Sequence, residues 1–309
     1  MLFMGKRYLL TGASGFLGAY LYENLIKYGE VDTLGRNPDS TISCDLGFEV
    51  PNIKSCYDCL VHAAGKAHFV PRTQEEKNEF DNVNYQGVVR LLKGIKYSGK
   101  LPNSIIVIST VAVYGLEHGN DITEDALCNP STPYGISKLK AENEFIRFGN
   151  EYDINIVILR LPLVIGKNPS GNLCDMIKAI KLGHFPLING GRAQRSMVFA
   201  QDIAHFLPKI QTEDGVFNLT DSYHPSYKAI AKVICESHNL KEVFNIPKAI
   251  AIVLAFIGET IGIITKRTFP FNLNRYYKMT RSLTFSDKKA QKYGWEPRPV
   301  IEYYKTIMK

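Results

Sequence analysis

The fold is decided by the stretch Leu10-Thr11-Gly12-Ala13-Ser14-Gly15-Phe16-Leu17-Gly18. Residues 7–11 form an apolar run that predicts a buried strand, and residues 15–28 predict a helix. Glycine at 12 permits the tight turn between them, glycine at 15 lets backbone amides approach a pyrophosphate, and glycine at 18 lets the helix pack close to the strand. A glycine-rich turn without a ligand is the alternative. The motif predicts a dinucleotide-binding loop, with expected cofactor contacts at Gly12, Ser14, Gly15, Phe16, Leu17 and Gly18.

Strand and helix patterns alternate through the first half of the chain. Strands are predicted at 30–34, 58–62, 104–109 and 155–160, and helices at 84–98 and 134–148. This alternation predicts an α/β fold of the Rossmann type, in which right-handed crossovers build a doubly wound parallel sheet. We expect a dinucleotide-binding domain over 1–165 and a smaller, mainly substrate-binding domain over 166–309, with about 200–225 returning to the first sheet.

Composition limits the classes of function. The chain has 309 residues, of which 45% are hydrophobic and 22% charged, the profile of a soluble globular protein. Its net charge of +7 suits an anionic small ligand, although a basic solvated surface is the alternative. The sequence lacks the runs of Lys and Arg with interleaved aromatic residues that favour nucleic acid. Its six cysteines are scattered without metal-site spacing, so we expect no metal and a cytoplasmic location.

Two segments bear on membranes. Residues 1–7 place their charge after the apolar residues and run directly into a strand, which is not the pattern of a signal peptide. Residues 249–265 are very apolar, but they are short for a membrane span and contain Glu259. We therefore expect no membrane span and interpret this segment mainly as a buried or partner-facing helix. A role at a membrane surface is the alternative.

The residues after the second predicted strand bear on the choice of cofactor. A carboxylate there would hydrogen-bond the adenosine ribose and repel a 2′-phosphate, but Arg36 stands at this place. Arg36 can neutralise a 2′-phosphate and Asp32 falls inside the strand, so NADP(H) is favoured over NAD(H). If Arg36 only stacks on the adenine, either cofactor binds. Asp45 and Leu46 lie where we expect an adenine contact, with a plain loop aspartate as the alternative.

A Tyr-x-x-x-Lys pair, Tyr134 and Lys138, lies further along the chain. Four residues apart on a helix, the two side chains face the same side. Because an ammonium group stabilises a nearby phenolate, we expect the pKa of Tyr134 to be lowered from about 10 toward the working range. Tyr134 is then a candidate proton donor and acceptor for a carbinol/carbonyl pair. By itself, the pair is also compatible with a solvated helix face.

A longer set of motifs points to a known family. It comprises Gly12-x-x-Gly15-x-x-Gly18, His62-Ala-Ala-Gly65, Ser109-Thr110, Tyr114-Gly115, Tyr134-x-x-x-Lys138 and Leu159-Arg160. In this order and spacing the chain resembles the extended short-chain dehydrogenase/reductase family, in its branch of NAD-dependent sugar-nucleotide epimerases and dehydratases. The resemblance continues through 195–202 to the closing segments 283–287 and 292–297. It implies a nucleotide-sugar substrate and a homodimer formed through the helices near Asn84 and Tyr134. It also implies that Asn84 has a structural role.

The resemblance implies roles for individual residues. Tyr134 is the implied acid/base, Lys138 lowers its pKa and bonds the nicotinamide ribose, and Thr110 holds the reacting sugar oxygen. Arg195 grips the substrate diphosphate and Arg192 helps it, since a guanidinium suits bidentate phosphate contact. A solvated surface arginine is the alternative for Arg195. Implied cofactor contacts are Ala63, Ala64, Gly65, Tyr134, Lys138 and Pro162.

Departures from the family pattern narrow the reaction. Dehydratases of the family carry an Asp-Glu pair where this chain has Val111 and Ala112, neither of which transfers a proton, so a 4,6-dehydratase is disfavoured. Galactose-type epimerases carry an asparagine where Leu161-Pro162-Leu163 stands, which weakens a simple UDP-glucose 4-epimerase. The stretches 63–68, 160–166 and 195–198 resemble bacterial 4-ketoreductases and 4-epimerases that act on UDP-N-acetylhexosamine derivatives.

The favoured function is therefore a 4-ketoreductase acting at C4 of a UDP-hexosamine-type sugar, because Arg36 suits NADPH, the cell's reducing pool. The alternative is a nucleotide-sugar 4-epimerase, acting on UDP-glucose or UDP-GlcNAc, which retains NAD. A hydroxysteroid-type dehydrogenase would not need Arg195, and its lipid would lie under residues 249–265. A non-catalytic NADP sensor would usually lack Tyr134 or Lys138, and this chain has both.

Overall fold

The computed structural model describes residues 5–67, 71, 73–167, 172–265, 269 and 271–307. Two sequence expectations fall partly outside these residues: the N-terminal pattern at 1–4 and the end of the motif at 63–68, where His68 stands.

Seven strands form the central sheet, in the order β11-β7-β5-β4-β1-β2-β3. The strands are β1 (Lys6–Thr11), β2 (Gly29–Gly35), β3 (Ile42–Ser43), β4 (Cys59–His62), β5 (Ser104–Thr110), β7 (Asn155–Leu161) and β11 (Gly215–Asn218). Each neighbouring pair is parallel, as crossovers through helices require. The prediction of a doubly wound Rossmann-type sheet is confirmed.

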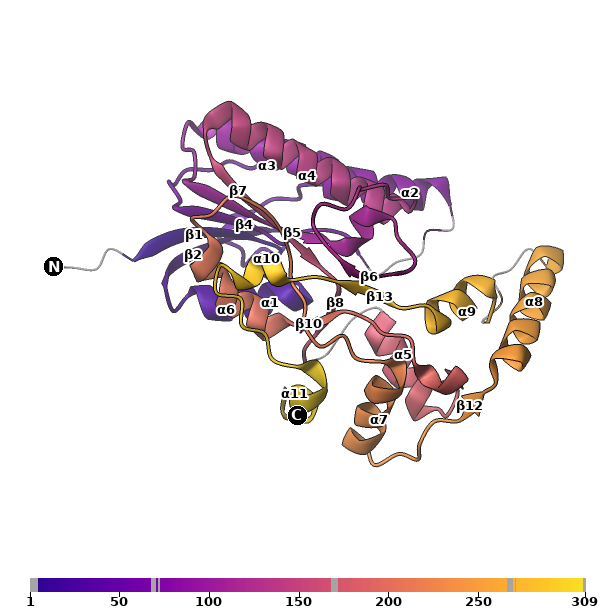
Figure 1. The fold of residues 1–309 in the computed structure, drawn as a ribbon. Coiled ribbons are helices and arrows are strands. Elements are labelled where there is room, and N and C mark those ends of the chain that lie inside the picture. The colour runs from indigo at the N-terminus through magenta and orange to yellow at the C-terminus, as the bar shows by residue number, and fades with distance from the viewer. Residues whose placement is uncertain are drawn as a thin grey trace.

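Helices cover both faces of this sheet (Figure 1). Successive side chains of β5 point to opposite faces, so Ile106 joins one apolar core while Ile105 and Val107 join the other. The first core also contains residues of α1 (Phe16–Leu25) and α6 (Ala200–Ile210). The second contains residues of α3 (Gly87–Ser98) and α4 (Pro133–Tyr152). The two-sided burial explains why the strands read as continuous apolar runs.

The helix expected at 84–98 begins earlier than predicted. It starts as α2 (Gln74–Phe80), passes through the π-helix η1 (Asp81–Gln86) and continues as α3. Thr73 starts it through a capping box, in which its hydroxyl accepts from the Glu76 amide at 3.2 Å and the Glu76 carboxylate accepts from the Thr73 amide at 3.1 Å. The polar composition of α2 gives no apolar periodicity, which is why the sequence did not reveal it.

Most of the rest of the described chain lies beyond the carboxyl end of the sheet, whereas α10 (Lys288–Gln291) packs against β11 (Figure 1). The rest of the chain contains the parallel strand pairs β8 (Leu163–Ile165) with β10 (Met197–Phe199), β9 (Leu187–Ile188) with β12 (Asn245–Ile246), and β6 (Gly119–Ile122) with β13 (Leu283–Phe285). Its helices are η2 (Val111–Tyr114), α5 (Asn172–Lys181), η3 (Asn189–Gly191), α7 (Tyr227–Ser237), α8 (Lys248–Thr265), α9 (Leu273–Thr280), α10 (Lys288–Gln291) and α11 (Val300–Ile307). The division into cofactor and substrate domains stays a prediction.

Helix α8 contradicts the expectation of a buried helix. Its buried residues are Ala251, Ala255 and Gly258, a narrow stripe of small side chains. In contrast, Ile263 and Ile264 are 72% and 75% exposed. Among the described residues, α8 is the one helix that is long and apolar enough to cross a membrane. An apolar sequence shows that a segment avoids water, but it does not show what covers the segment, so the partner-facing interpretation stays a prediction.

Candidate active site

The glycine loop lies between β1 and α1, where two of its glycines are fixed by contacts. Gly12 has a positive φ of 75°, and a Cβ there would lie 2.6 Å from the Ala64 amide nitrogen. A Cβ on Gly18 would lie 2.0 Å from the Gly12 carbonyl oxygen. Gly15 is the N-cap of α1 and gives the helix no side-chain cap, so the first N–H groups of α1 stay available to an anion.

Asn84 anchors the loop that follows β4. Its amide donates to the Lys66 carbonyl and to the Ser137 hydroxyl, both at 3.0 Å, and its oxygen accepts from the Lys66 amide at 2.7 Å. A Cβ on Gly65 would lie 3.1 Å from that oxygen. Asn84 is 1% exposed, and it joins the loop, η1 and α4 in one contact. These contacts fit the structural role that the family resemblance implied.

The structure brings three predicted residues together at the carboxyl end of β5. Thr110 is the last residue of β5, and Tyr134 lies in the first turn of α4, where the Thr110 side chain is close enough to lower the pKa of the phenol. Lys138 lies one turn further along α4, buried, and donates from Nζ to the Ile108 carbonyl at 2.7 Å. Thr132 caps α4 by accepting from the Gly135 amide at 3.1 Å, which fixes where this first turn begins.

The two ionisable groups of this cluster have shifted pKa values. Burial raises the pKa of Tyr134 to about 12, and the Thr110 side chain opposes this shift. Burial lowers the pKa of Lys138 to about 8, and the nearby Glu142 carboxylate opposes that shift. The prediction that the pKa of Tyr134 is lowered is therefore wrong. Desolvation of the phenolate dominates, and the Lys138 ammonium group is directed at a backbone carbonyl.

A buried ion pair behind Lys138 was not predicted. The Glu142 carboxylate lies 2.8 Å from Nη2 of Arg160 in β7, and both side chains are almost fully buried. Ser109 also donates to Glu142, and the Arg160 guanidinium stacks 4.8 Å from the Tyr114 ring centre. One sequence signal could have found Glu142: it follows Lys138 by four residues, as Lys138 follows Tyr134.

His62 ends β4 next to this cluster and is buried. Its Nδ1 lies 2.9 Å from the Thr11 hydroxyl oxygen, which also accepts from the Ala64 amide at 3.1 Å. Burial, and then the Lys138 charge, lower the pKa of His62 to about 3. The imidazole is therefore neutral at physiological pH, and through Thr11 it joins the end of β1 to the loop that follows β4.

Arg195 is held by backbone carbonyls at the end of α9. Its Nη1 donates to the Arg281 carbonyl at 2.8 Å, and Nη2 donates to the Lys278 carbonyl. Its Nε donates to the Tyr227 hydroxyl at 3.2 Å, and the guanidinium lies over the Tyr227 ring. These contacts orient the side chain, and the choice between a diphosphate ligand and a solvated arginine stays a prediction. Arg192 is exposed at the end of η3.

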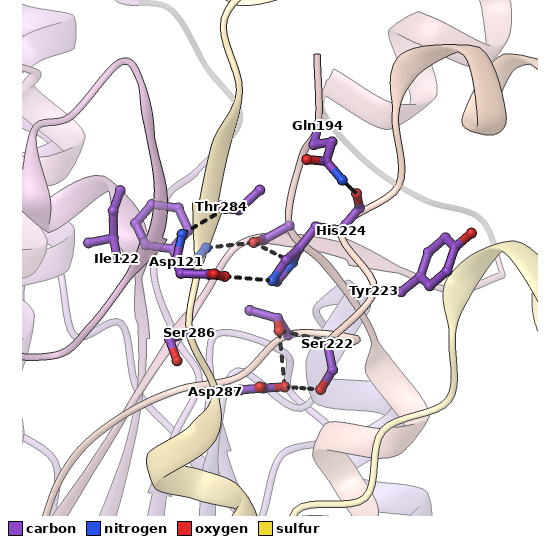
Figure 2. A network of polar contacts seen from close by, with 12 residues as sticks. Asp121, Ile122, Gln194, Ser222, Tyr223, His224, Thr284, Ser286 and Asp287 are labelled. Carbon is purple, nitrogen blue, oxygen red and sulfur yellow. Dashed lines mark hydrogen bonds and ion pairs between the residues drawn. The ribbon is translucent and has the colours of Figure 1, made fainter. Parts of the chain in front are cut away.

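A polar network fastens the surroundings of this arginine to β6, as Figure 2 shows. The Ser222 hydroxyl donates to the Asp287 carboxylate at 2.6 Å, and His224 Nε2 lies 3.6 Å from the Asp121 carboxylate. Gln194, the residue before the arginine, donates to the His224 carbonyl at 3.1 Å. Strand β6 follows η2, and η2 begins directly after Thr110, the last residue of β5. The network therefore connects the loop of Arg195 to the end of β5, beside which Tyr134 lies.

The other predicted cofactor contacts lie along the same edge. Arg36 directly follows β2 and is exposed, with no hydrogen bond or ion pair to the other residues that the structure describes. Asp32 lies inside β2, as predicted, and accepts from the Tyr57 hydroxyl at 2.8 Å and from Arg7 at 3.1 Å. The Asp45 carboxylate accepts from the Gly47 amide at 2.8 Å. Leu46 follows it against α3, and Pro162 joins β7 to β8.

Comparison with known proteins settles the family. Residues 8–219, more than half of the chain, match the model of the NAD dependent epimerase/dehydratase family. The chain belongs to this family. It is an enzyme of the extended short-chain dehydrogenase/reductase type.

Two relatives and one solved structure resemble this chain along almost its whole length. It is 24% identical to the N-acetyl-alpha-D-glucosaminyl-diphospho-ditrans,octacis-undecaprenol 4-epimerase of Escherichia coli O157:H7, over 94% of this chain and 91% of the relative. It is 25% identical, over the same shares, to a UDP-glucose 4-epimerase of Streptococcus mutans serotype c. The structure of MoeE5 in complex with UDP-glucuronic acid and NAD matches with a TM-score of 0.72 and 20% identity, over 98% of this chain and 97% of that chain.

The residues present fit the nicotinamide dinucleotide that the family implies. The uncapped start of α1 offers backbone N–H groups to a pyrophosphate, and Gly12 and Gly18 keep that turn close to β1. Ala63 and Ala64 have small side chains, so the loop after β4 leaves room beside the turn. Arg36 would lie near the adenosine end because it follows β2.

Proposed function

We propose that this enzyme is a 4-epimerase of a diphosphate-linked N-acetylhexosamine. The observation that carries the proposal is the placement of Thr110 at the end of β5 beside Tyr134 in the first turn of α4, one helical turn from Lys138. The two relatives described above are both named as 4-epimerases, and one is named for an N-acetylglucosaminyl diphosphate carried by a lipid. Leu161-Pro162-Leu163 disfavours simple UDP-glucose chemistry, which leaves a hexosamine as the better candidate.

The chain's own residues supply the proton chemistry at C4. When bound, the nicotinamide cofactor supplies the hydride acceptor and donor. Tyr134 takes the proton of the C4 hydroxyl during oxidation and returns it during reduction, while the Thr110 hydroxyl holds the same oxygen. The raised pKa of Tyr134 makes the neutral phenol its resting form, which is the form that donates a proton to a C4 oxyanion. The oxidation half-reaction therefore requires that the phenol first lose its proton to solvent, because only the phenolate can accept the proton of the C4 hydroxyl. Val111 and Ala112 add no second proton-transfer group, so the chemistry is confined to C4.

A 4-ketoreductase is the second candidate, and Arg36 is the observation that favours it. This guanidinium is exposed at the end of β2, where it can neutralise the 2′-phosphate of NADP(H), and Asp32 is already engaged with Arg7 and Tyr57. A reductase would run the half-reaction once in each turnover and exchange its cofactor.

We further propose that the chain beyond residue 166 covers the sugar and its diphosphate, with Arg195 as the phosphate ligand.

The test combines stereochemistry with cofactor consumption. The purified protein is incubated with catalytic NAD or NADP and with either UDP-GlcNAc or GlcNAc diphosphoundecaprenol, and the C4 configuration of the product is determined by NMR. A third arm contains stoichiometric NADPH and the 4-keto derivative of UDP-GlcNAc. We expect C4 inversion without a net change in nicotinamide absorbance, and the productive donor identifies the carrier. Stoichiometric NADPH consumption with a 4-keto sugar, without inversion, would overturn the epimerase in favour of the reductase. No reaction in any arm would reject both.

A further inference from the structure

The outer surface of α8 is an apolar face without a partner among the described residues. At about 100° per residue, its buried stripe of Ala251, Ala255 and Gly258 occupies one side of the helix. Exposed apolar side chains extend over roughly half of the circumference, on the opposite side. They include Val253, Leu254, Phe256, Ile257, Ile263 and Ile264. Soluble proteins seldom expose a continuous apolar surface of this kind unless it binds something.

The helix is held at its middle, so it can lie on an apolar phase but not cross it. A Cβ on Gly258 would lie 1.9 Å from the Phe271 carbonyl oxygen, which places α8 directly against the chain that leads into α9. The Glu259 carboxylate accepts from the Leu273 amide at the start of α9. Figure 1 shows α8 at the outer edge of the molecule, with α9 between it and the rest of the protein. Crossing a bilayer would separate these contacts.

Charge identifies the occupant of this face. The sequence from 248 to 281 contains six basic residues and one acidic residue, so it carries a net charge of +5 out of +7 for the whole chain. Lys248, Lys278 and Arg281 are exposed at the ends of α8 and α9. In a symmetric dimer through α8 these like charges would meet and repel each other. An anionic surface attracts them while its hydrocarbon covers the apolar side chains.

We propose that α8 docks the enzyme on anionic phospholipid membranes, lying in the plane of the interface. Apolar side chains of α8 enter the headgroup and acyl boundary, and the basic residues around the hairpin of α8 and α9 meet the phosphate groups. Arg195 caps α9, so the docked hairpin would adjoin the candidate diphosphate site. The docking stands apart from the proposed reaction, and an enzyme that epimerises sugars without binding vesicles would disprove the docking alone.

Sedimentation with lipid vesicles tests the proposal on the full chain. We expect binding to phosphatidylcholine vesicles that contain phosphatidylglycerol, weaker binding to pure phosphatidylcholine, and a loss of binding as salt increases. Replacing two exposed isoleucines, Ile263→Ser with Ile264→Ser, should weaken binding by about tenfold or more. Lys248→Gln with Lys278→Gln should remove much of the preference for the anionic vesicles.

The matched control replaces two equally exposed apolar residues elsewhere, Phe48→Ser with Leu127→Ser, which are 78% and 83% exposed. This variant should bind vesicles as the unmodified protein does. Equal losses in both variants, or no vesicle binding at all, would overturn the proposal. Light scattering without lipid supplies the other decisive result: a dimer that only the α8 variant dissociates, together with no vesicle binding, would show that a second copy covers this face.

Discussion

Helices α4 and α8 are two long helices of the described chain that bury opposite kinds of side chain. Helix α4 buries charged groups, since Lys138 and Glu142 are 6% and 1% exposed on the face that meets the sheet. Helix α8 exposes hydrocarbon and buries only small side chains. Both arrangements are unfavourable unless something else compensates them. For α4 the compensation is an internal set of hydrogen bonds and an ion pair, whereas for α8 none comes from the other described residues.

The largest effect is expected at the start of α4. Replacing Tyr134→Phe removes the proton donor and acceptor, and turnover should fall by about 10²–10⁴-fold. Cofactor binding, measured by nicotinamide fluorescence titration, should stay intact because the ring itself remains. Tyr152→Phe, on the last turn of the same helix, is the matched control and should keep its turnover. Unchanged turnover in Tyr134→Phe would show that Tyr134 is not the proton donor and acceptor.

The buried charge of α4 gives the next effect. Replacing Glu142→Gln leaves the Arg160 guanidinium buried without its counter-charge, and the free energy of unfolding should fall by about 3–5 kcal/mol. Chemical denaturation measures this loss. The exposed Arg147, paired with Glu144 on the same helix, is the control, since Arg147→Ala should change stability by less than about 1 kcal/mol. If the double variant Glu142→Leu with Arg160→Met is no more stable than Glu142→Gln, the ion pair was not the cause.

Acid should reveal a third effect, at His62 beside α4. Its pKa is about 3 in the folded protein and about 6.5 when unfolded, so the unfolded chain binds more protons between these values. Stability is therefore retained above about pH 6.5 and is lost as the pH falls toward 3. Between about pH 6.5 and 4.5 the loss from this group should be roughly 2–3 kcal/mol. The His62→Asn variant should show a smaller loss over the same range, and equal losses would refute the assignment.

Helix α8 should give the smallest effect in solution. Replacing Ile264→Ala should change the free energy of unfolding by at most about 0.5 kcal/mol, because the side chain is 75% exposed. The same change at the buried Ile158→Ala in β7 should destabilise the protein by about 2–5 kcal/mol. Thermal denaturation without lipid compares the two. A loss above about 1 kcal/mol for Ile264→Ala would show that α8 is already covered in solution.

The same contrast explains how far the sequence predicts the molecule. The glycine loop, the β-branched strands and the spacing of Tyr134 and Lys138 are local patterns, so they predicted the sheet and the position of the pair. The pairing of Glu142 with Arg160 joins a helix to a strand, and nothing in the order of the residues states that the two will meet. The pKa of Tyr134 also depended on packing, because burial outweighed the charge predicted to control it. For α8, the apolar composition predicted a helix that would be covered, but it did not predict that most of its apolar side chains lie on the outside of the protein.

The pairing of β6 with β13 has a consequence for how the enzyme forms during synthesis. The Asp121 amide donates to the Thr284 hydroxyl, a contact that spans 163 positions of the chain. A nascent chain that ends before residue 283 therefore lacks the partner that places the loop of Arg195, although all seven strands of the main sheet have been made. We expect such a chain to form its main sheet first and to fix the loop of Arg195 only late, after the slow search that distant pairings impose.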